Sequence, residues 1–236
     1  MRTPIHISPP NCSHGPSTHS LMDTGTAMRR TLLLASLLMI ILPLSGLAQQ
    51  GNASVGGGVA FPLASSSRFV NPSGHFVLGA GVNIKSRFGV TSEFLWQKLP
   101  VKQEVLNGSG ILDANAIQMA LTLNGIVRFP LGKRLGGYTI GGAGWYIRTG
   151  SLRFSGAGPT PEVICGPFLA WWGLNCISAQ FPEQKSSDAF GGNVGVGLTT
   201  HLGEGGMKFF TEIRFHYAPH WGVNTDTLLV TSGLRW

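Results

Sequence analysis

The feature of this sequence that most limits its fold is an alternation of apolar residues with polar or small ones. Between residues 75 and 85 every second residue is apolar, namely Phe76, Leu78, Ala80, Val82 and Ile84. The residues between them, from His75 to Lys85, are polar or small. A period of two puts successive side chains on opposite faces of a β-strand, and no amphipathic helix has this period. The pattern therefore predicts strands with one apolar and one polar face.

Eight segments of this kind follow one another. They are residues 53–63, 75–85, 88–98, 116–129, 137–149, 189–201, 207–217 and a last segment that ends at Trp236. Each can supply the roughly 9–11 residues that a tilted strand needs to cross a bilayer. Short connections (85–87, 131–136, 203–206) alternate with longer ones (64–74, 99–115, 150–188, 218–226), as in barrels with short periplasmic turns and long external loops. The sequence therefore predicts an all-β fold, an eight-stranded antiparallel up-and-down transmembrane β-barrel.

Aromatic side chains are expected at the two borders of the lipid-facing band. Under this topology Phe88, Tyr138 and Trp236 fall near the periplasmic border, and Trp96 and Trp221 near the external one. The segment 137–149 is so rich in glycine that its register is weakly specified, which leaves the direction of Trp145 open.

The few charged residues fall mainly on the polar faces. Only 11% of the chain is charged, whereas about 25% is usual in soluble proteins. The predicted inner face carries five charged residues, Glu93, Arg128, Glu212, Arg214 and Arg235. Because eight strands enclose a space just wide enough for side chains, and buried charges need partners, we expect salt bridges that fill the lumen. The alternative is a narrow or gated ion path. A secreted lipocalin-type barrel would need the apolar faces inside, the reverse of this arrangement.

The amino-terminal region predicts export. From Met28 the order is basic Arg29-Arg30, an uncharged leucine-rich run, and small residues up to Ala48, which is typical of a secretory signal cleaved after Ala48. We therefore assign 28–48 to a signal peptide, 1–27 to an over-extended N-terminus, and 49–236 to the barrel domain.

Two cysteines and three large apolar residues stand in the connection 150–188. Cys165 and Cys176 would close a short disulfide ring in an oxidising compartment, since no paired ligand supports the rival zinc site. Phe168, Trp171 and Trp172 lie inside that ring. They are candidates for contact with a partner or a membrane surface, or else they fold over the barrel mouth.

The last two segments carry a resemblance to a known family. Residues 209–217 (FFTEIRFHY) and the terminal Ser-Gly-Leu-Arg-Trp resemble the last two strands of the OmpA-like and opacity-type outer-membrane barrel family of small porin-like barrels, and 191–198 resembles its sixth strand. The likeness covers 51–236. It implies a place in the outer membrane of a Gram-negative bacterium. It also implies that Trp236, where phenylalanine is more usual, is the signal that the barrel-assembly machinery reads.

These features predict a non-enzymatic outer-membrane protein with a structural or surface-interaction role. The expected partners are outer-membrane lipid and lipopolysaccharide, the assembly machinery and an extracellular partner of unknown identity. We expect no cofactor, metal or catalytic site. The alternative is a lipid A-modifying enzyme, but Ala218 stands where such barrels place a serine two positions after a histidine, here His216. Despite the formal net charge of +7, the basic residues form no patch that would bind nucleic acid.

Overall fold

The computed structural model describes residues 51–107, 111–154, 163–165, 176–178, 183–203, 206–220 and 224–236. The predicted N-terminal extension 1–27 and signal peptide 28–48 lie outside these ranges. In the described part of the chain, no helix is both long enough and apolar enough to cross a bilayer.

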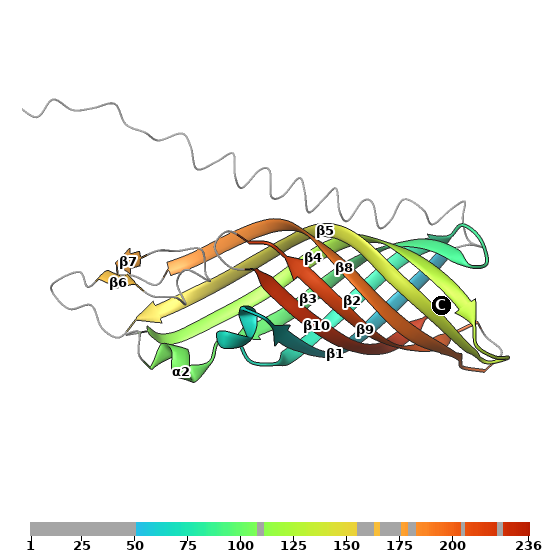
Figure 1. The fold of residues 1–236 in the computed structure, drawn as a ribbon, viewed down its shortest axis with the longest axis horizontal. Coiled ribbons are helices and arrows are strands. Elements are labelled where there is room, and N and C mark those ends of the chain that lie inside the picture. The colour runs from blue at the N-terminus through green and yellow to red at the C-terminus, as the bar shows by residue number, and fades with distance from the viewer. Residues whose placement is uncertain are drawn as a thin grey trace, which may run out of the picture. The chain divides into compact units, whose positions relative to one another are not determined.

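Eight antiparallel strands close into a barrel (Figure 1). They are β1 (Gly51–Leu63), β2 (Ser73–Asn83), β3 (Phe88–Pro100), β4 (Ile111–Pro130), β5 (Leu135–Phe154), β8 (Glu183–His201), β9 (Lys208–Ala218) and β10 (Thr225–Arg235). Each pairs with its neighbour in the chain, and β1 pairs with β10 to close the cylinder. The short elements are a 3-10 helix η1 (Ser66–Arg68), a helical turn α2 (Gln103–Leu106) and a separate hairpin of β6 (Val163–Cys165) and β7 (Cys176–Ser178). The predicted eight-stranded up-and-down barrel is confirmed.

The alternation sorts side chains between the lumen and the outer wall. On β9, for example, Glu212 and Arg214 are buried in the lumen while Ile213 between them is 48% exposed on the outer wall. The structure also settles the open register of β5, because Trp145 faces outward and Tyr146 is buried inside. Tyr138 is likewise buried in the lumen, so its predicted place at the periplasmic aromatic border is wrong. Glycine residues on both faces around it had hidden the phase of the alternation.

Three strands extend five or six residues beyond their predicted ends. β4 begins at Ile111, β5 runs to Phe154 and β8 begins at Glu183, so parts of the predicted connections 99–115 and 150–188 are strand. Figure 1 shows these strands reaching beyond the rest of the barrel at one end. Their extensions carry polar residues on the outer face, such as Asp113 and Ser151, so the apolar-out pattern did not predict them, although backbone pairing continues. We call this the long-loop end, and the end with connections 84–87, 131–134 and 202–207 the short-turn end.

An apolar band surrounds the middle of the barrel. On β4 the outward residues from Ile117 to Phe129 are apolar or glycine, and the next outward ones, Asn115 and Asp113, are polar and exposed. At about 3.3 Å per residue and a tilt of about 45°, this stretch rises about 28 Å along the barrel axis. A lipid-facing band is about 25 Å tall. The outward polar residue Ser151 on β5 opposes Asn115 in the same extension.

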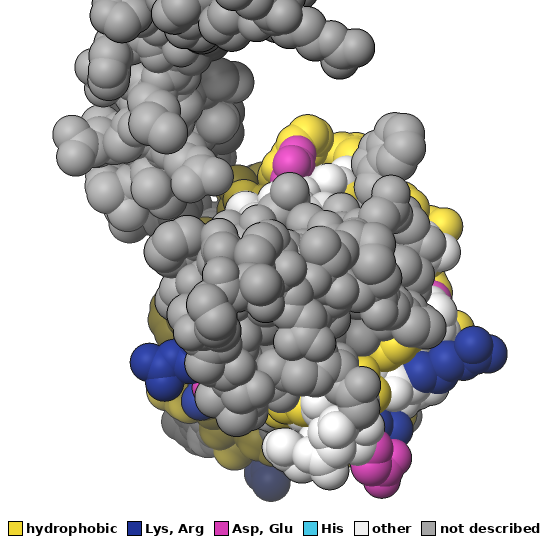
Figure 2. Space-filling view, turned by 90° about the vertical axis from the view of Figure 1, so that its left-hand side faces the viewer, with side chains coloured by type: hydrophobic (Ala, Val, Ile, Leu, Met, Phe, Trp, Pro, Cys, Tyr) yellow, Lys and Arg dark blue, Asp and Glu magenta, His cyan; other side chains and the backbone are white. Residues whose placement is uncertain are grey.

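Large aromatic side chains mark both edges of this band. Phe88, Phe129 and Trp236 are exposed at the short-turn end. Toward the other end, Trp145 is 49% exposed and Trp96 stacks on Phe76 with ring centroids 5.5 Å apart. Seen from the long-loop end, hydrophobic side chains lie along the sides of the barrel, with charged ones at its rim (Figure 2). Trp221 falls outside the described residues.

Candidate functional site in the barrel lumen

Arg214 of β9 lies at the centre of the lumen and bridges two strands. Its Nη1 pairs with Glu93 Oε2 on β3, and its Nε donates to Glu212 Oε1 at 2.6 Å. All three side chains are at least nine-tenths buried. Two carboxylates around one guanidinium leave a net charge of −1, which neighbouring donors must stabilise.

Uncharged donors complete this centre. Asn124 on β4 donates to Glu93 Oε2 at 2.8 Å and accepts from Asn193 on β8 at 2.8 Å. The Tyr138 hydroxyl donates to Glu212 Oε2 at 2.8 Å. The chain of contacts therefore joins β3, β4, β5, β8 and β9 across the lumen. Buried polar networks of this kind hold strands in one register.

The other two predicted members of the charge network lie apart from Arg214. Arg235 is 6% exposed, and its guanidinium lies 4.8 Å from the Tyr138 ring centre and 5.0 Å from that of Phe210. Arg128 is half-buried toward the short-turn end. Both ion pairs found in the described chain are made by Arg214, so the structure brings together three of the five predicted residues.

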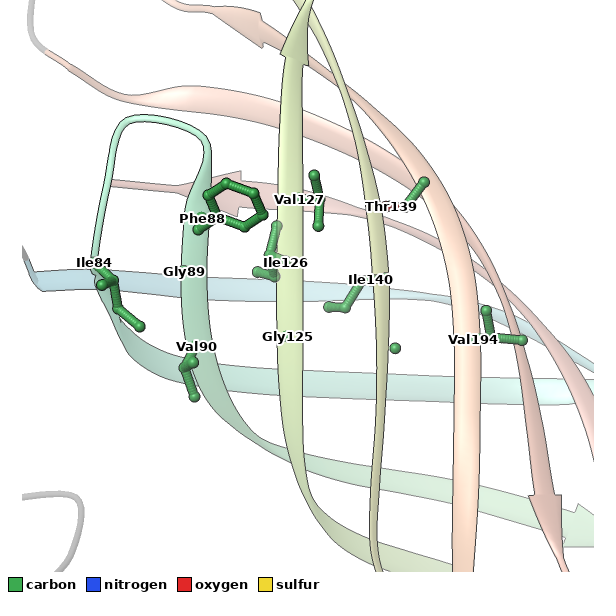
Figure 3. A pocket seen from close by; sticks show the side chains of 11 residues that line it. Ile84, Phe88, Gly89, Val90, Gly125, Ile126, Val127, Thr139, Ile140 and Val194 are labelled. Atoms are coloured by element: carbon green, nitrogen blue, oxygen red, sulfur yellow. The ribbon is translucent and has the colours of Figure 1, made fainter.

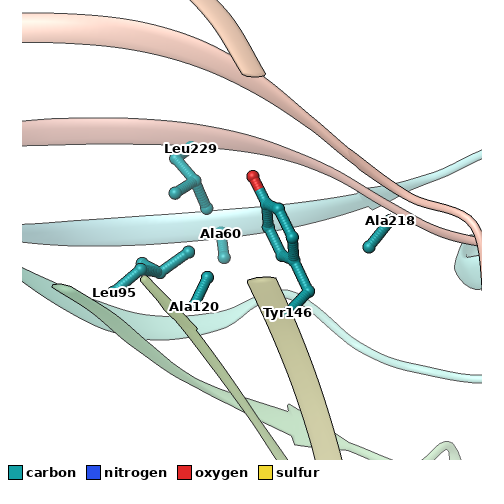
Figure 4. Packing of buried hydrophobic residues seen from close by; sticks show 6 residues of the cluster. All are labelled: Ala60, Leu95, Ala120, Tyr146, Ala218 and Leu229. Atoms are coloured by element: carbon teal, nitrogen blue, oxygen red, sulfur yellow. The ribbon is translucent and has the colours of Figure 1, made fainter. Parts of the chain in front are cut away.

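Above the charged centre, toward the long-loop end, the lumen becomes less polar. His75 Nε2 and the Thr231 hydroxyl lie 2.8 Å apart, and the Tyr146 hydroxyl lies 2.9 Å from His216 Nδ1. Tyr146 then packs with the buried apolar residues Ala60, Leu95, Ala120, Ala218 and Leu229 (Figure 4). These side chains come from six strands and meet inside the cylinder. The polar centre is thereby separated from the mouth by an apolar layer.

Polar residues return at the long-loop end. Arg148 donates to the Thr225 hydroxyl at 2.8 Å, and the Ser187 hydroxyl lies 3.2 Å from His220 Nδ1. Catalytic Ser–His pairs are oriented by an acid on the second ring nitrogen, but His220 Nε2 has no hydrogen-bond partner among the residues described. In that same part of the chain no three His, Cys, Asp or Glu side chains gather as metal ligands would.

His220 gives the long-loop end a predicted pH dependence. Burial, with the charge of Arg148 nearby, lowers the pKa of His220 from 6.5 to about 4. Because the unfolded chain takes up this proton first, the stability that neutral His220 supports is complete above pH 6.5 and is lost as the pH falls toward 4. We expect acidification from about pH 7 to about pH 4.5 to lower the wild-type unfolding midpoint more than that of His220→Gln, measured by the heat-induced gel shift. Equal drops in the two proteins would contradict this role.

The predicted loop site is described only in its backbone. Cys165 and Cys176 are opposed Cα partners where β6 pairs with β7. Opposed residues in an antiparallel pair have Cα atoms about 4.5–5.5 Å apart, within the range that a disulfide spans. Phe168, Trp171 and Trp172 lie outside the described residues.

The sequence did not predict the contacts that the tyrosines and histidines make in the lumen. Tyr138, Tyr146 and His75 each hydrogen-bond a partner on a distant strand. The period of two places His75 on the inner face, but it cannot reveal which strands lie across the lumen. For Tyr138 the glycine-rich segment concealed even the face.

A cavity of about 700 Å³ opens at the short-turn end. Its lining is basic and includes Lys85, Arg87, Arg128, Lys208 and Arg235, with no aspartate or glutamate among the described residues. A second hollow, of about 480 Å³, lies on the outer wall beside Gly125 (Figure 3). Gly141 opposes Gly125 on the neighbouring strand and also lines this hollow. Its other walls are almost entirely apolar, with Phe88, Val127 and Val194 around the two glycines.

No protein-family model matches the chain, and no curated protein matches it. Among solved structures, neisserial surface protein A is 11% identical with a TM-score of 0.52, and the match covers 78% of this chain and 95% of that one. A major outer membrane protein from Thermus thermophilus is 10% identical with a TM-score of 0.50, over 79% of this chain and 98% of that one. The attachment invasion locus protein Ail of Yersinia pestis is 15% identical with a TM-score of 0.46, over 80% and 100%. The likeness to the first two shows the fold.

Proposed function

We propose that this chain is an outer-membrane β-barrel of the OmpA-like type with a structural or surface-interaction role. The observation that carries the proposal is the apolar outer wall, which rises about 28 Å between aromatic borders and has an ionic lumen behind it. Such a wall needs lipid around it, since a water-soluble barrel would expose its polar face. Export by the signal peptide 28–48 and recognition of Trp236 by the assembly machinery belong to the same proposal.

The side chains in the lumen favour a closed, filled barrel rather than an open pore. Arg214, Glu93 and Glu212 fill its centre, and Tyr146 with its apolar neighbours fills the layer above. An eight-stranded barrel has little space beyond its side chains. We therefore propose that the network holds the strands together rather than conducting ions.

The interacting surface in this proposal is the long-loop end, facing the outside of the cell. The extensions of β4 and β5 project beyond the apolar band and carry exposed polar residues, among them the opposed pair Asp113 and Arg153. The connection between β5 and β8 contains the apolar ring with Phe168, Trp171 and Trp172. We propose that this ring contacts an extracellular partner, and that lipopolysaccharide surrounds the barrel wall below it.

We also propose a Cys165–Cys176 disulfide at the base of that ring. The opposed backbone positions support it, and closing a loop of this size stabilises it by about 3 kcal/mol. Protein purified from cells without reductant should resist thiol alkylation until it is reduced, with a mass shift for both cysteines measured by peptide mass spectrometry. Alkylation of both thiols without reduction would count against the bond.

Two measurements test the proposed function. The protein should fractionate with the outer membrane, and unheated samples should run differently on a gel from boiled ones because the barrel stays folded in detergent. Trp171→Ala with Trp172→Ala should reduce binding of intact cells to a host-cell or matrix surface, whereas Trp145→Ala on the barrel wall should not. A protein recovered in the soluble fraction would refute the membrane assignment, and unchanged cell binding would refute the role of the ring.

A further inference from the structure

Among the described residues, the basic side chains at the short-turn end have no acidic partner in the lumen network. Glu212 already accepts from Arg214 and Tyr138, and Glu93 accepts from Arg214 and Asn124. Both buried carboxylates therefore already have partners at the centre of the lumen. Arg235, Arg128 and Lys208 lie below it, and none of the three has a carboxylate partner in the described chain. The 700 Å³ cavity is lined by these three residues.

The three cations are held close together. Lys208 and Arg235 are opposed partners on β9 and β10, and Arg128 opposes Tyr138, over whose ring the Arg235 guanidinium lies. The charges of Arg128 and Arg235 both act on Lys208. Like charges placed together without a counter-ion repel one another. An anion bound among the three cations would relieve this repulsion.

The guanidinium of Arg235 is fixed in place and has a free donor for such an anion. Arg235 is only 6% exposed, yet its Nη1 has no hydrogen-bond partner among the described residues. The rings of Tyr138 and Phe210 fix its plane. A buried charged donor without a hydrogen-bond partner lowers the stability of the fold unless an acceptor binds to it. Around the cavity mouth, Lys85, Arg87, Lys133 and Arg134 add further positive charge.

We infer that the short-turn end of the barrel is a binding site for a phosphoryl group, held by Arg128, Lys208 and Arg235. Arginine pairs bidentately with the tetrahedral oxygens of phosphate, and lysine adds a point charge. The group comes either from the headgroup of an inner-leaflet phospholipid or from a soluble phosphate compound. Its periplasmic location rests on the proposed function, but the binding chemistry does not. The charged centre and the apolar layer above make the site a blind pocket, so the anion binds there and does not pass through.

Two probes in neutral detergent micelles test the inference on the folded full chain. Isothermal titration with inorganic pyrophosphate at low salt should show saturable binding that weakens as salt is added. Native mass spectrometry should show phosphatidylglycerol retained in preference to phosphatidylcholine. Binding of pyrophosphate alone identifies a soluble phosphate compound, and retention of phosphatidylglycerol alone identifies a lipid headgroup. Either result supports the site.

Substitutions locate the binding. Arg128→Gln with Lys208→Gln, and separately Arg235→Gln, should weaken it by about tenfold or more, the size of one hydrogen bond between charged groups. The Arg128→Gln/Lys208→Gln variant keeps Arg235 packed in the lumen. It therefore still tests the site if Arg235→Gln does not fold. Lys98→Gln with Lys102→Gln removes the same charge at the other end and should bind like wild type.

Three results would overturn the site. The first is that the wild type binds neither probe saturably. The second is that the Lys98→Gln/Lys102→Gln control loses as much affinity as the variants at the site. The third is that citrate, which carries charge but no phosphoryl group, binds as tightly as pyrophosphate. Because a protein that fractionates with the outer membrane can still fail these binding tests, failure here is distinct from failure of the proposed function.

Discussion

Arg214→Leu is expected to destabilise the barrel by about 3–5 kcal/mol, because it leaves buried carboxylates without their cation. Glu93 and Glu212 would remain 4% and 3% exposed with only Asn124 and Tyr138 as donors. The measurement is the urea midpoint of unfolding in lipid vesicles, followed by the gel shift between folded and unfolded bands. We also expect less folded protein in the outer membrane of cells.

The matched control is Arg153→Leu, which removes the same charge from an exposed position on β5 and should change stability by less than about 0.5 kcal/mol. A second variant combines Arg214→Leu with Glu93→Gln and Glu212→Gln. It should recover much of the lost stability, since no uncompensated charge stays buried. If Arg214→Leu unfolds at the same urea concentration as Arg153→Leu, the lumen network does not hold the barrel together.

Gly142→Val is expected to lower the free energy of unfolding by about 3 kcal/mol or more, at the upper end of the range for overpacked cores. Gly142 faces the lumen on β5, and a Cβ there would overlap the backbone carbonyl of Leu123 and the side chain of Asn124. Backbone cannot move aside without breaking the pairing of β4 with β5. Asn124 would also lose its position against Glu93. The same urea titration and gel shift measure the effect.

Gly125→Val is the control on the neighbouring strand. Gly125 faces outward beside the hollow of Figure 3, and the nearest atom to a Cβ there is the Gly141 carbonyl oxygen at 3.8 Å. A valine at this position fills part of an apolar hollow and should be neutral or mildly stabilising in a membrane. Equal losses from Gly142→Val and Gly125→Val would mean that lumen packing does not distinguish the two faces.

The positions of the charged residues explain why the two ends of the barrel differ. Both glutamates of the lumen serve the centre, while the basic residues below them lack acidic partners in the described chain. The long-loop end instead carries mixed polar residues, such as Asp113 and Arg153, on strand extensions. The proposed surface contacts and the inferred phosphoryl site therefore belong to opposite ends, and substitutions at one end should not affect the other.

The strand count, the antiparallel order and the face of most side chains could be predicted from the amino-acid sequence. Each of these follows from local rules, since a period of two fixes opposite faces and short connections force neighbours to pair antiparallel. The charged residues Glu93, Glu212 and Arg214 could be placed inside for the same reason. In residues 137–149 glycine removed the contrast between faces, so Tyr138 was misplaced.

The contacts between inner side chains could not be predicted in this way. Glu93 and Arg214 are 121 residues apart, and their contact depends on the stagger of eight strands around a closed cylinder, a property of the whole sheet. The same stagger separates Arg235 and Arg128 from the carboxylates and gathers them with Lys208 around a cavity. Pairing across a lumen is non-local, so it becomes visible only once the barrel is closed.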